Sequence, residues 1–115
     1  MPTVVHNKLV RDRIPEIIEQ SGSTCITRIL TQEEYIAALD AKLQEELHEY
    51  LVDKSMEELA DLLEVLMAVA EARGASFAQV DALRREKAEQ RGSFRERIFL
   101  ESVSKGEEQH ARHPL

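Results

Sequence analysis

Residues 31–73 read TQEEYIAALDAKLQEELHEYLVDKSMEELADLLEVLMAVAEAR, and they set the architecture of the chain. Two helix starts occur within this stretch. Thr31-Gln32-Glu33-Glu34 and Ser55-Met56-Glu57-Glu58 both match the capping box, in which a hydroxyl side chain caps the helix and a Glu three residues later completes the cap. We predict one helix over about 31–54 and a second over about 55–73. Because almost no chain separates them, the two helices are expected to run antiparallel.

Shorter helices are expected on both sides of this pair. Pro15 suits the first turn of a short helix that Gly22 ends. Ser76-Phe77-Ala78-Gln79 is a third capping box, and it opens a helix that ends near Gly92. The run Cys25–Leu30 has some β character but is too short to predict a strand.

The pattern as a whole predicts an all-α fold. We expect a helical bundle with two long central antiparallel helices plus shorter N- and C-terminal helices. A length of 115 residues fits one small domain, which we place at residues 1–100, followed by a polar tail over residues 101–115. The one cysteine, Cys25, cannot form an intrachain disulfide, and no apolar run is long enough for a signal peptide or a membrane span. A cytoplasmic protein with no membrane partner is therefore expected.

The formal net charge of −7 is unevenly distributed along the chain. Residues 31–71 carry −10, whereas residues 1–30 carry +1, residues 72–100 carry +3 and residues 101–115 carry −1. An acidic chain lacks the basic surface that is needed to grip a nucleic acid polymer. An acidic middle between two basic ends suits a bound metal cation together with an anionic ligand. A solvated acidic helix face is the alternative interpretation of the same charges.

A helical projection of the first long helix shows one apolar stripe. Its members are Tyr35, Ile36, Leu39, Leu43, Leu47, Tyr50 and Leu51. Glu46 projects within the stripe and Glu49 projects at its edge, beside Lys42 and Asp53. Glu45 projects well away from the stripe. Two acidic side chains of this helix are thus expected to face the core.

The second long helix is apolar over most of its circumference, which is typical of a helix buried at the centre of a protein. Its solvent-facing side is marked by acidic residues at heptad spacing: Glu57, Glu64 and Glu71. Glu58 instead projects into the apolar arc, and Asp61 lies beside it. Both carboxylates are therefore expected to face inward.

Four carboxylates on two adjacent helices are expected to meet: Glu46, Glu49, Glu58 and Asp61. An isolated buried charge is very costly, and four like charges cannot neutralise one another. A divalent cation resolves the conflict, and oxygen-only ligands select a hard ion such as Mg²⁺ or Mn²⁺. Structural alternatives exist for single members, since Glu58 completes a capping box and Glu49 could pair with Lys42 or Lys54.

The acidic motifs also resemble a known signature. Glu45-Glu46-Leu47-His48-Glu49 followed by Glu58-Leu59-Ala60-Asp61 resembles the EExxE…ExxD signature of the all-α nucleoside triphosphate pyrophosphohydrolases, the MazG-like proteins. That superfamily includes phosphoribosyl-ATP pyrophosphohydrolase and the all-α dUTPases. Lys8-Leu9-Val10-Arg11-Asp12-Arg13-Ile14-Pro15-Glu16-Ile17-Ile18 is similar to the opening of a small single-domain branch. Lys87 and Arg91-Gly92-Ser93-Phe94 match a basic stretch that ends in Arg-Gly-x-Phe in that branch.

The resemblance implies Mg²⁺-dependent cleavage of a nucleoside triphosphate between the α and β phosphates, with house-cleaning of nucleotide pools as the role. It also implies that the catalytic, metal-binding residues are Glu46, Glu49, Glu58 and Asp61. Mn²⁺ is a possible substitute ion. Glu49, at the edge of the stripe, is the candidate general base, and Glu45 has a supporting role at most. The resemblance further implies a homodimer or a dimer of dimers, which the thin core of so short a helical chain also favours.

Basic residues near both ends are candidates for binding phosphate oxygens. They are Lys8, Arg11, Arg13, Lys42, Lys87 and Arg91. Phosphoribosyl-ATP pyrophosphohydrolase of histidine biosynthesis is the alternative enzyme, and a non-enzymatic acidic helical interaction module is the alternative without chemistry. A ferritin-like di-iron site requires two Glu-x-x-His units, and only Glu45–His48 provides one.

Overall fold

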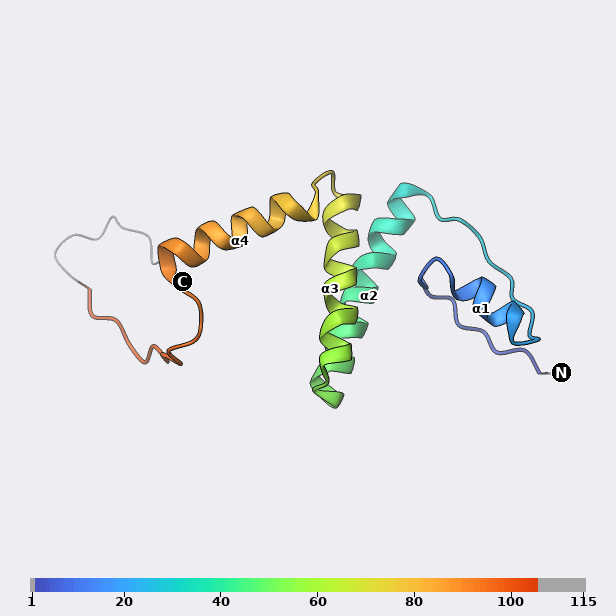
Figure 1. Ribbon diagram of the computed structural model, residues 1–115, viewed down its shortest axis with the longest axis horizontal. Coiled ribbons are helices and arrows are strands. Elements are labelled where there is room, and N and C mark those ends of the chain that lie inside the picture. The colour runs from blue at the N-terminus through green and yellow to red at the C-terminus, as the bar shows by residue number, and fades with distance from the viewer. Residues whose placement is uncertain (1, 106–115) are drawn as a thin grey trace. The chain divides into compact units, whose positions relative to one another are not determined.

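The computed structural model describes residues 2–105. Its chain divides into two units, residues 1–77 and residues 78–115, and each is described by itself. The described residues form four helices and no strand: α1 (Ile14–Gln20), α2 (Gln32–Asp53), α3 (Met56–Ala72) and α4 (Phe77–Arg91) (Figure 1). The predicted all-α class and the positions of all four helices are confirmed. None of these helices is long and apolar enough to cross a membrane.

The start of α2 is fixed by a complete capping box. The Thr31 Oγ1 accepts the Glu34 N–H at 3.2 Å, and the Glu34 carboxylate accepts the Thr31 N–H at 3.0 Å. Arg28 donates to both carboxylate oxygens of Glu34, at 3.2 and 3.1 Å. The Arg28 bonds, helped by the Thr31 N–H, lower the pKa of Glu34 to about 2. The loop before α2 is thereby tied to the first turn of the helix.

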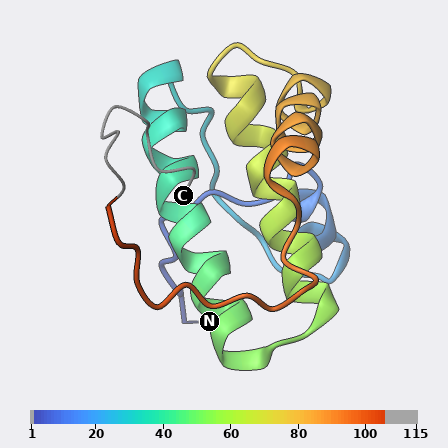
Figure 2. The same ribbon diagram turned by 90° about the vertical axis from the view of Figure 1, so that its left-hand side faces the viewer.

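A two-residue turn joins α2 to α3. Lys54 adopts the left-handed conformation, with φ of 57°, and its N–H bonds to the Tyr50 carbonyl at 2.7 Å. Ser55 then caps α3, because its Oγ accepts the Glu58 N–H at 3.2 Å. Within the described contacts only this half of the predicted second capping box is formed. The short turn makes α2 and α3 run side by side in opposite directions, as Figures 1 and 2 show.

The packed core of the first unit lies between α2 and α3, the only two helices of this unit that pack against each other. Leu39, Val65 and Ala70 are its buried hydrophobic residues. The sequence predicts α3 to be buried at the centre, and in the single chain this is wrong. One side of α3 is exposed along its length: Met56, Leu59, Leu63 and Leu66. The physical reason is that, within the first unit, only α2 covers α3.

The remaining predicted elements are present with small differences. Helix α1 carries Pro15 in its first turn and is followed by Gly22 at a φ of 94°. Cys25–Leu30 forms no strand. In the second unit α4 ends at Arg91, followed by Gly92 at a φ of 85°. The single domain over residues 1–100 stays a prediction, and residues 106–115 of the expected tail lie outside the described residues.

Glu34→Gln tests the electrostatic tie at the start of α2. A carboxylate whose pKa is lowered by folding stabilises the folded state at pH values above its ordinary pKa of 4.5. This contribution is lost as the pH falls through about 2. We expect the variant to be less stable than the wild type at pH 6, and the difference to shrink steadily between about pH 4.5 and 2. Urea unfolding followed by circular dichroism over this range measures it.

Glu33→Gln is the matched control, because Glu33 lies in the same first turn and makes no ion pair within residues 2–105. Its effect on the free energy of unfolding at pH 6 is expected to be small, because no ion pair is lost. A Glu34→Gln deficit that stays constant from pH 6 to pH 2 would contradict this account of the cap.

Candidate functional site: a carboxylate cluster

Carboxylates from α2 and α3 meet near the turn that joins the two helices. Glu46, Glu58 and Asp61 each offer an oxygen atom within 4.8 Å of the other two. Glu49, Asp53 and Glu58 form a second group that meets the same distance limit. We call these five residues the carboxylate cluster. Glu58 belongs to both groups, so the cluster is continuous across the two helices.

Helix geometry explains why these side chains converge. On α2, Glu46, Glu49 and Asp53 are spaced by three and four residues and therefore share one face. On α3, Glu58 and Asp61 are spaced by three residues, beginning one turn after the Ser55 cap. The four residues predicted to meet are thus members of one cluster. Asp53 was not predicted to belong to the cluster, although its i,i+4 spacing from Glu49 provides the signal.

The cluster concentrates negative charge where solvent access is reduced. Glu46 is only 9% exposed, and it is the only charged residue in the described part of the chain that is buried. Partial burial raises the pKa of Glu58, and the neighbouring negative charges raise it further. Those charges belong to Asp61, Glu46, Glu49 and Asp53, in decreasing order of effect. The carboxylates therefore repel one another, and positive charge placed among them is strongly favoured.

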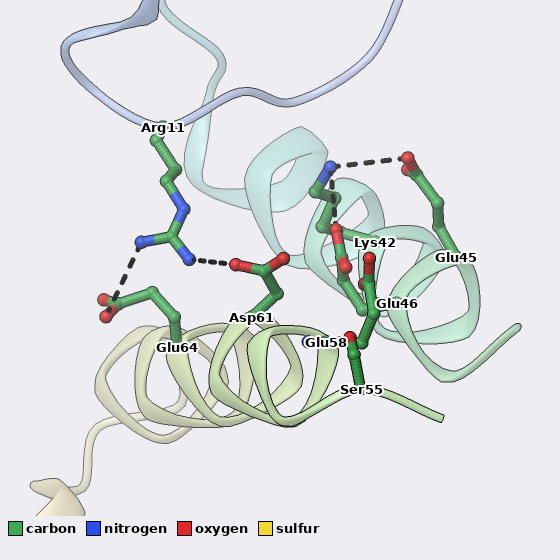
Figure 3. Close-up of polar contacts among 8 residues, drawn as sticks. All are labelled: Arg11, Lys42, Glu45, Glu46, Ser55, Glu58, Asp61 and Glu64. Carbon is green, nitrogen blue, oxygen red and sulfur yellow. Dashed lines mark hydrogen bonds and ion pairs between the residues drawn. The ribbon is translucent and has the colours of Figure 1, made fainter. Parts of the chain in front are cut away.

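Two cations of the chain already lie against the cluster. Lys42 Nζ is 3.3 Å from the Glu46 carboxylate, one turn away on α2. Arg11 donates from Nη2 to Asp61 Oδ1 at 2.7 Å, and its Nη1 is 4.0 Å from the Glu64 carboxylate. Figure 3 shows Arg11 reaching from the N-terminal segment to α3. No such ion pair is formed by Glu49, Asp53 or Glu58 within residues 2–105.

Glu45 lies outside the cluster, as its helical projection predicts. Its Oε1 accepts from Lys8 Nζ at 3.2 Å. The same oxygen accepts from Lys42 Nζ at 3.5 Å (Figure 3). Partial burial raises the pKa of Glu45, but the hydrogen bond from Lys8 and the charges of Lys42 and Lys8 together lower it below its ordinary value. Glu45 thus links the N-terminal segment to α2.

Of the six predicted phosphate-binding residues, three lie at or beside the carboxylate cluster. These are Lys8, Arg11 and Lys42. Arg13 instead pairs with Glu16 on α1, at 3.3 Å. Lys87 and Arg91 are exposed on α4, in the second unit, and neither makes an ion pair in the part of the chain that the structure describes.

The chemistry of the cluster is that of a set of hard oxygen donors. Mg²⁺ and Mn²⁺ prefer carboxylate ligands and tolerate bound water in the remaining positions. Glu46, Glu58 and Asp61 form the part of the cluster best shielded from solvent, and their mutual distances allow one ion to contact all three. These residues therefore fit a divalent cation of this class.

Comparisons with known proteins leave the family open. No family model matches the sequence, and no solved structure matches it. An uncharacterized protein of Mycolicibacterium smegmatis is 62% identical over 42 residues. This match covers 36% of the present chain and 43% of that protein, so the chain spans less than half of its relative.

Lys42→Ala tests whether the chain itself must compensate the buried charge of the cluster. Truncation leaves the Glu46 carboxylate without its cation, beside Glu58 and Asp61, so we expect a loss of about 1–3 kcal/mol in the free energy of unfolding. The double variant Lys42→Ala with Glu46→Gln is expected to recover much of this loss, because the group that lost its cation is then neutral. Urea unfolding of the four members of the cycle gives the coupling.

Lys54→Ala is the control for this cycle. Lys54 is exposed, lies over the Tyr50 ring at 5.4 Å from its centroid, and forms no ion pair within residues 2–105. Equal losses for the two lysine variants, with no recovery in the double variant, would show that the Lys42 pair does not stabilise the cluster.

Proposed function

We propose that this protein is a Mg²⁺-dependent nucleoside triphosphate pyrophosphohydrolase of the all-α, MazG-like superfamily. The observation that carries the proposal is the convergence of four motif carboxylates between two adjacent antiparallel helices. These are Glu46 and Glu49 of the first motif and Glu58 and Asp61 of the second. The reaction adds water across the α–β phosphoanhydride and yields a nucleoside monophosphate and pyrophosphate. We further propose that the protein is cytoplasmic and that neither a nucleic acid polymer nor a membrane is its partner.

The four carboxylates would hold the cation. When bound, Mg²⁺ or Mn²⁺ neutralises the triphosphate and lowers the pKa of a coordinated water. Glu46 is 9% exposed and so would be a ligand with little freedom to move toward solvent. Glu58 and Asp61 would supply the ligands from α3, so the proposed site depends on the register between the two helices.

The remaining roles fall to residues at the edge of the cluster. Glu49 is the proposed general base, since it is less buried than Glu46 and is free of ion pairs within residues 2–105. Asp53 offers a carboxylate oxygen within 4.8 Å of Glu49 and Glu58, at the more exposed end of the cluster. Lys8, Arg11 and Lys42 are placed to bind phosphate oxygens that the cation does not hold.

The proposal extends to the assembly of the molecule. We expect a homodimer or a dimer of dimers in which a second copy covers the exposed side of α3 and completes a helical bundle. Leu59, Leu63 and Leu66 are 38–46% exposed in the single chain, at the spacing of one helix face. A continuous apolar stripe of this kind is typical of a helix that packs against a partner.

Pyrophosphate release tests the proposed reaction. We expect Mg²⁺-dependent release from at least one nucleotide in a panel of canonical and damaged nucleoside triphosphates that also contains phosphoribosyl-ATP. Glu46→Gln and Asp61→Asn are expected to abolish release, by a factor of about 10² or more, because each removes a ligand charge from the site. Circular dichroism spectra of both variants should match that of the wild type.

Glu57→Gln is the matched control, since it changes an exposed carboxylate on α3 that lies outside the cluster, and it should keep full activity. Selective turnover of phosphoribosyl-ATP would assign the alternative enzyme. Survival of every nucleotide at micromolar enzyme, with no effect of Mg²⁺ on the melting temperature, would leave the acidic interaction module as the better description.

Leu63→Glu tests the proposed assembly. Sedimentation velocity is expected to give a dimer or tetramer for the wild type and a monomer for the variant, because a charge in the apolar stripe would be buried without a partner. Ala37→Glu, which adds the same charge at an exposed position of α2, is the control and should not change the state. A wild-type protein that sediments as a monomer at 100 μM would contradict this part of the proposal.

A further inference from the structure

The N-terminal segment is tied to both helices of the hairpin by two ion pairs. Lys8 binds Glu45 on α2 at 3.2 Å, and Arg11, three residues later, binds Asp61 on α3 at 2.7 Å. The partners are 37 and 50 residues apart in the sequence, so these contacts are tertiary. Residues 8–11 therefore lie across the edge of the carboxylate cluster rather than apart from it.

The two ion pairs involve carboxylates with different roles. Glu45 is outside the cluster, and within residues 2–105 its carboxylate is bound by two lysines, Lys8 and Lys42. Asp61 is inside the cluster, and the oxygen that accepts from Arg11 belongs to a carboxylate that the proposed function assigns to the cation. A carboxylate with a guanidinium at 2.7 Å binds a divalent cation less well, because the two positive charges repel and the guanidinium already uses one of the two carboxylate oxygens.

We propose that Arg11 competes with the divalent cation for Asp61, and that cation binding transfers Arg11 from Asp61 to a phosphate of the substrate. The inference rests on the proposed metal site. In the metal-free chain Arg11 neutralises Asp61. With a cation on that carboxylate, Arg11 would be free to leave Asp61, while the bond from Lys8 to Glu45 would keep the segment beside the site. Arg11 would thus be a phosphate-binding residue whose availability depends on the cation.

The exposure of each cation indicates why Arg11 is the one that moves. The Arg11 side chain is 56% exposed and extends from a segment outside the helices, so it can leave Asp61 at little cost. Lys42 also pairs with a cluster member, Glu46, but it is only 18% exposed and is held on α2 itself. The planar fork of a guanidinium suits two oxygens of one phosphate, which makes Arg11 a good ligand after its release.

Binding of Mn²⁺ alone, followed by the electron paramagnetic resonance signal of the free ion, tests the competition. We expect Arg11→Gln to bind Mn²⁺ more tightly than the wild type, by about two- to fivefold, the range given by the strength of an exposed ion pair. Arg13→Gln is the matched control. It removes the same charge two residues away, where the side chain pairs with Glu16 on α1, and it should leave Mn²⁺ affinity unchanged. A merely structural role for Arg11 predicts weaker binding in the variant.

A second readout follows the guanidinium itself. In ¹⁵N spectra of the arginine side chains, Mg²⁺ is expected to shift the Arg11 signals toward those of a free guanidinium and to leave the Arg13 signals in place. Unchanged or weaker Mn²⁺ binding by Arg11→Gln, or equal tightening by Arg13→Gln, overturns the competition and leaves the proposed metal site standing. A wild-type chain that binds no Mn²⁺ at millimolar concentration overturns the proposed function, and this inference with it.

Discussion

Repulsion among the carboxylates between α2 and α3 is the constraint on which the other contacts of the first unit depend. Glu46 is 9% exposed, and Glu58 faces negative charge from both helices. Two cations offset part of this negative charge by forming ion pairs, Lys42 on α2 and Arg11 in the N-terminal segment. Within residues 2–105, these cations pair with two members of the five-residue cluster, Glu46 and Asp61. The remaining negative charge is what the proposed divalent cation would neutralise.

The register of the helix hairpin determines which carboxylates of α2 and α3 lie close together. Because the turn consists of Lys54 and Ser55 alone, the end of α2 must lie opposite the start of α3. The Ser55 cap fixes the first turn of α3, and Glu58 and Asp61 then follow at set angles. A shift of one residue in either helix would rotate its carboxylates by about 100° and separate them. The Ser55 cap and the geometry of the carboxylate cluster therefore depend on the same few residues.

Local signals in the sequence predicted most of the fold and much of the candidate site. Capping residues predicted where α2 and α3 begin, and helical periodicity predicted that Glu46 and Asp61 face the same interior. The tertiary ion pairs could not be predicted, because the bond from Arg11 to Asp61 depends on the path of the loop between α1 and α2. The exposure of α3 was also missed, since an apolar helix indicates burial without indicating which chain provides the cover.

We propose that the carboxylate cluster holds a divalent cation. The decisive experiment is a crystal grown with Mn²⁺, with diffraction recorded at the manganese absorption edge. We expect an anomalous peak bounded by Glu46, Glu58 and Asp61, with Arg11 displaced from Asp61. An ordered cluster with no anomalous peak at millimolar Mn²⁺, and with the bond from Arg11 to Asp61 intact, would contradict it.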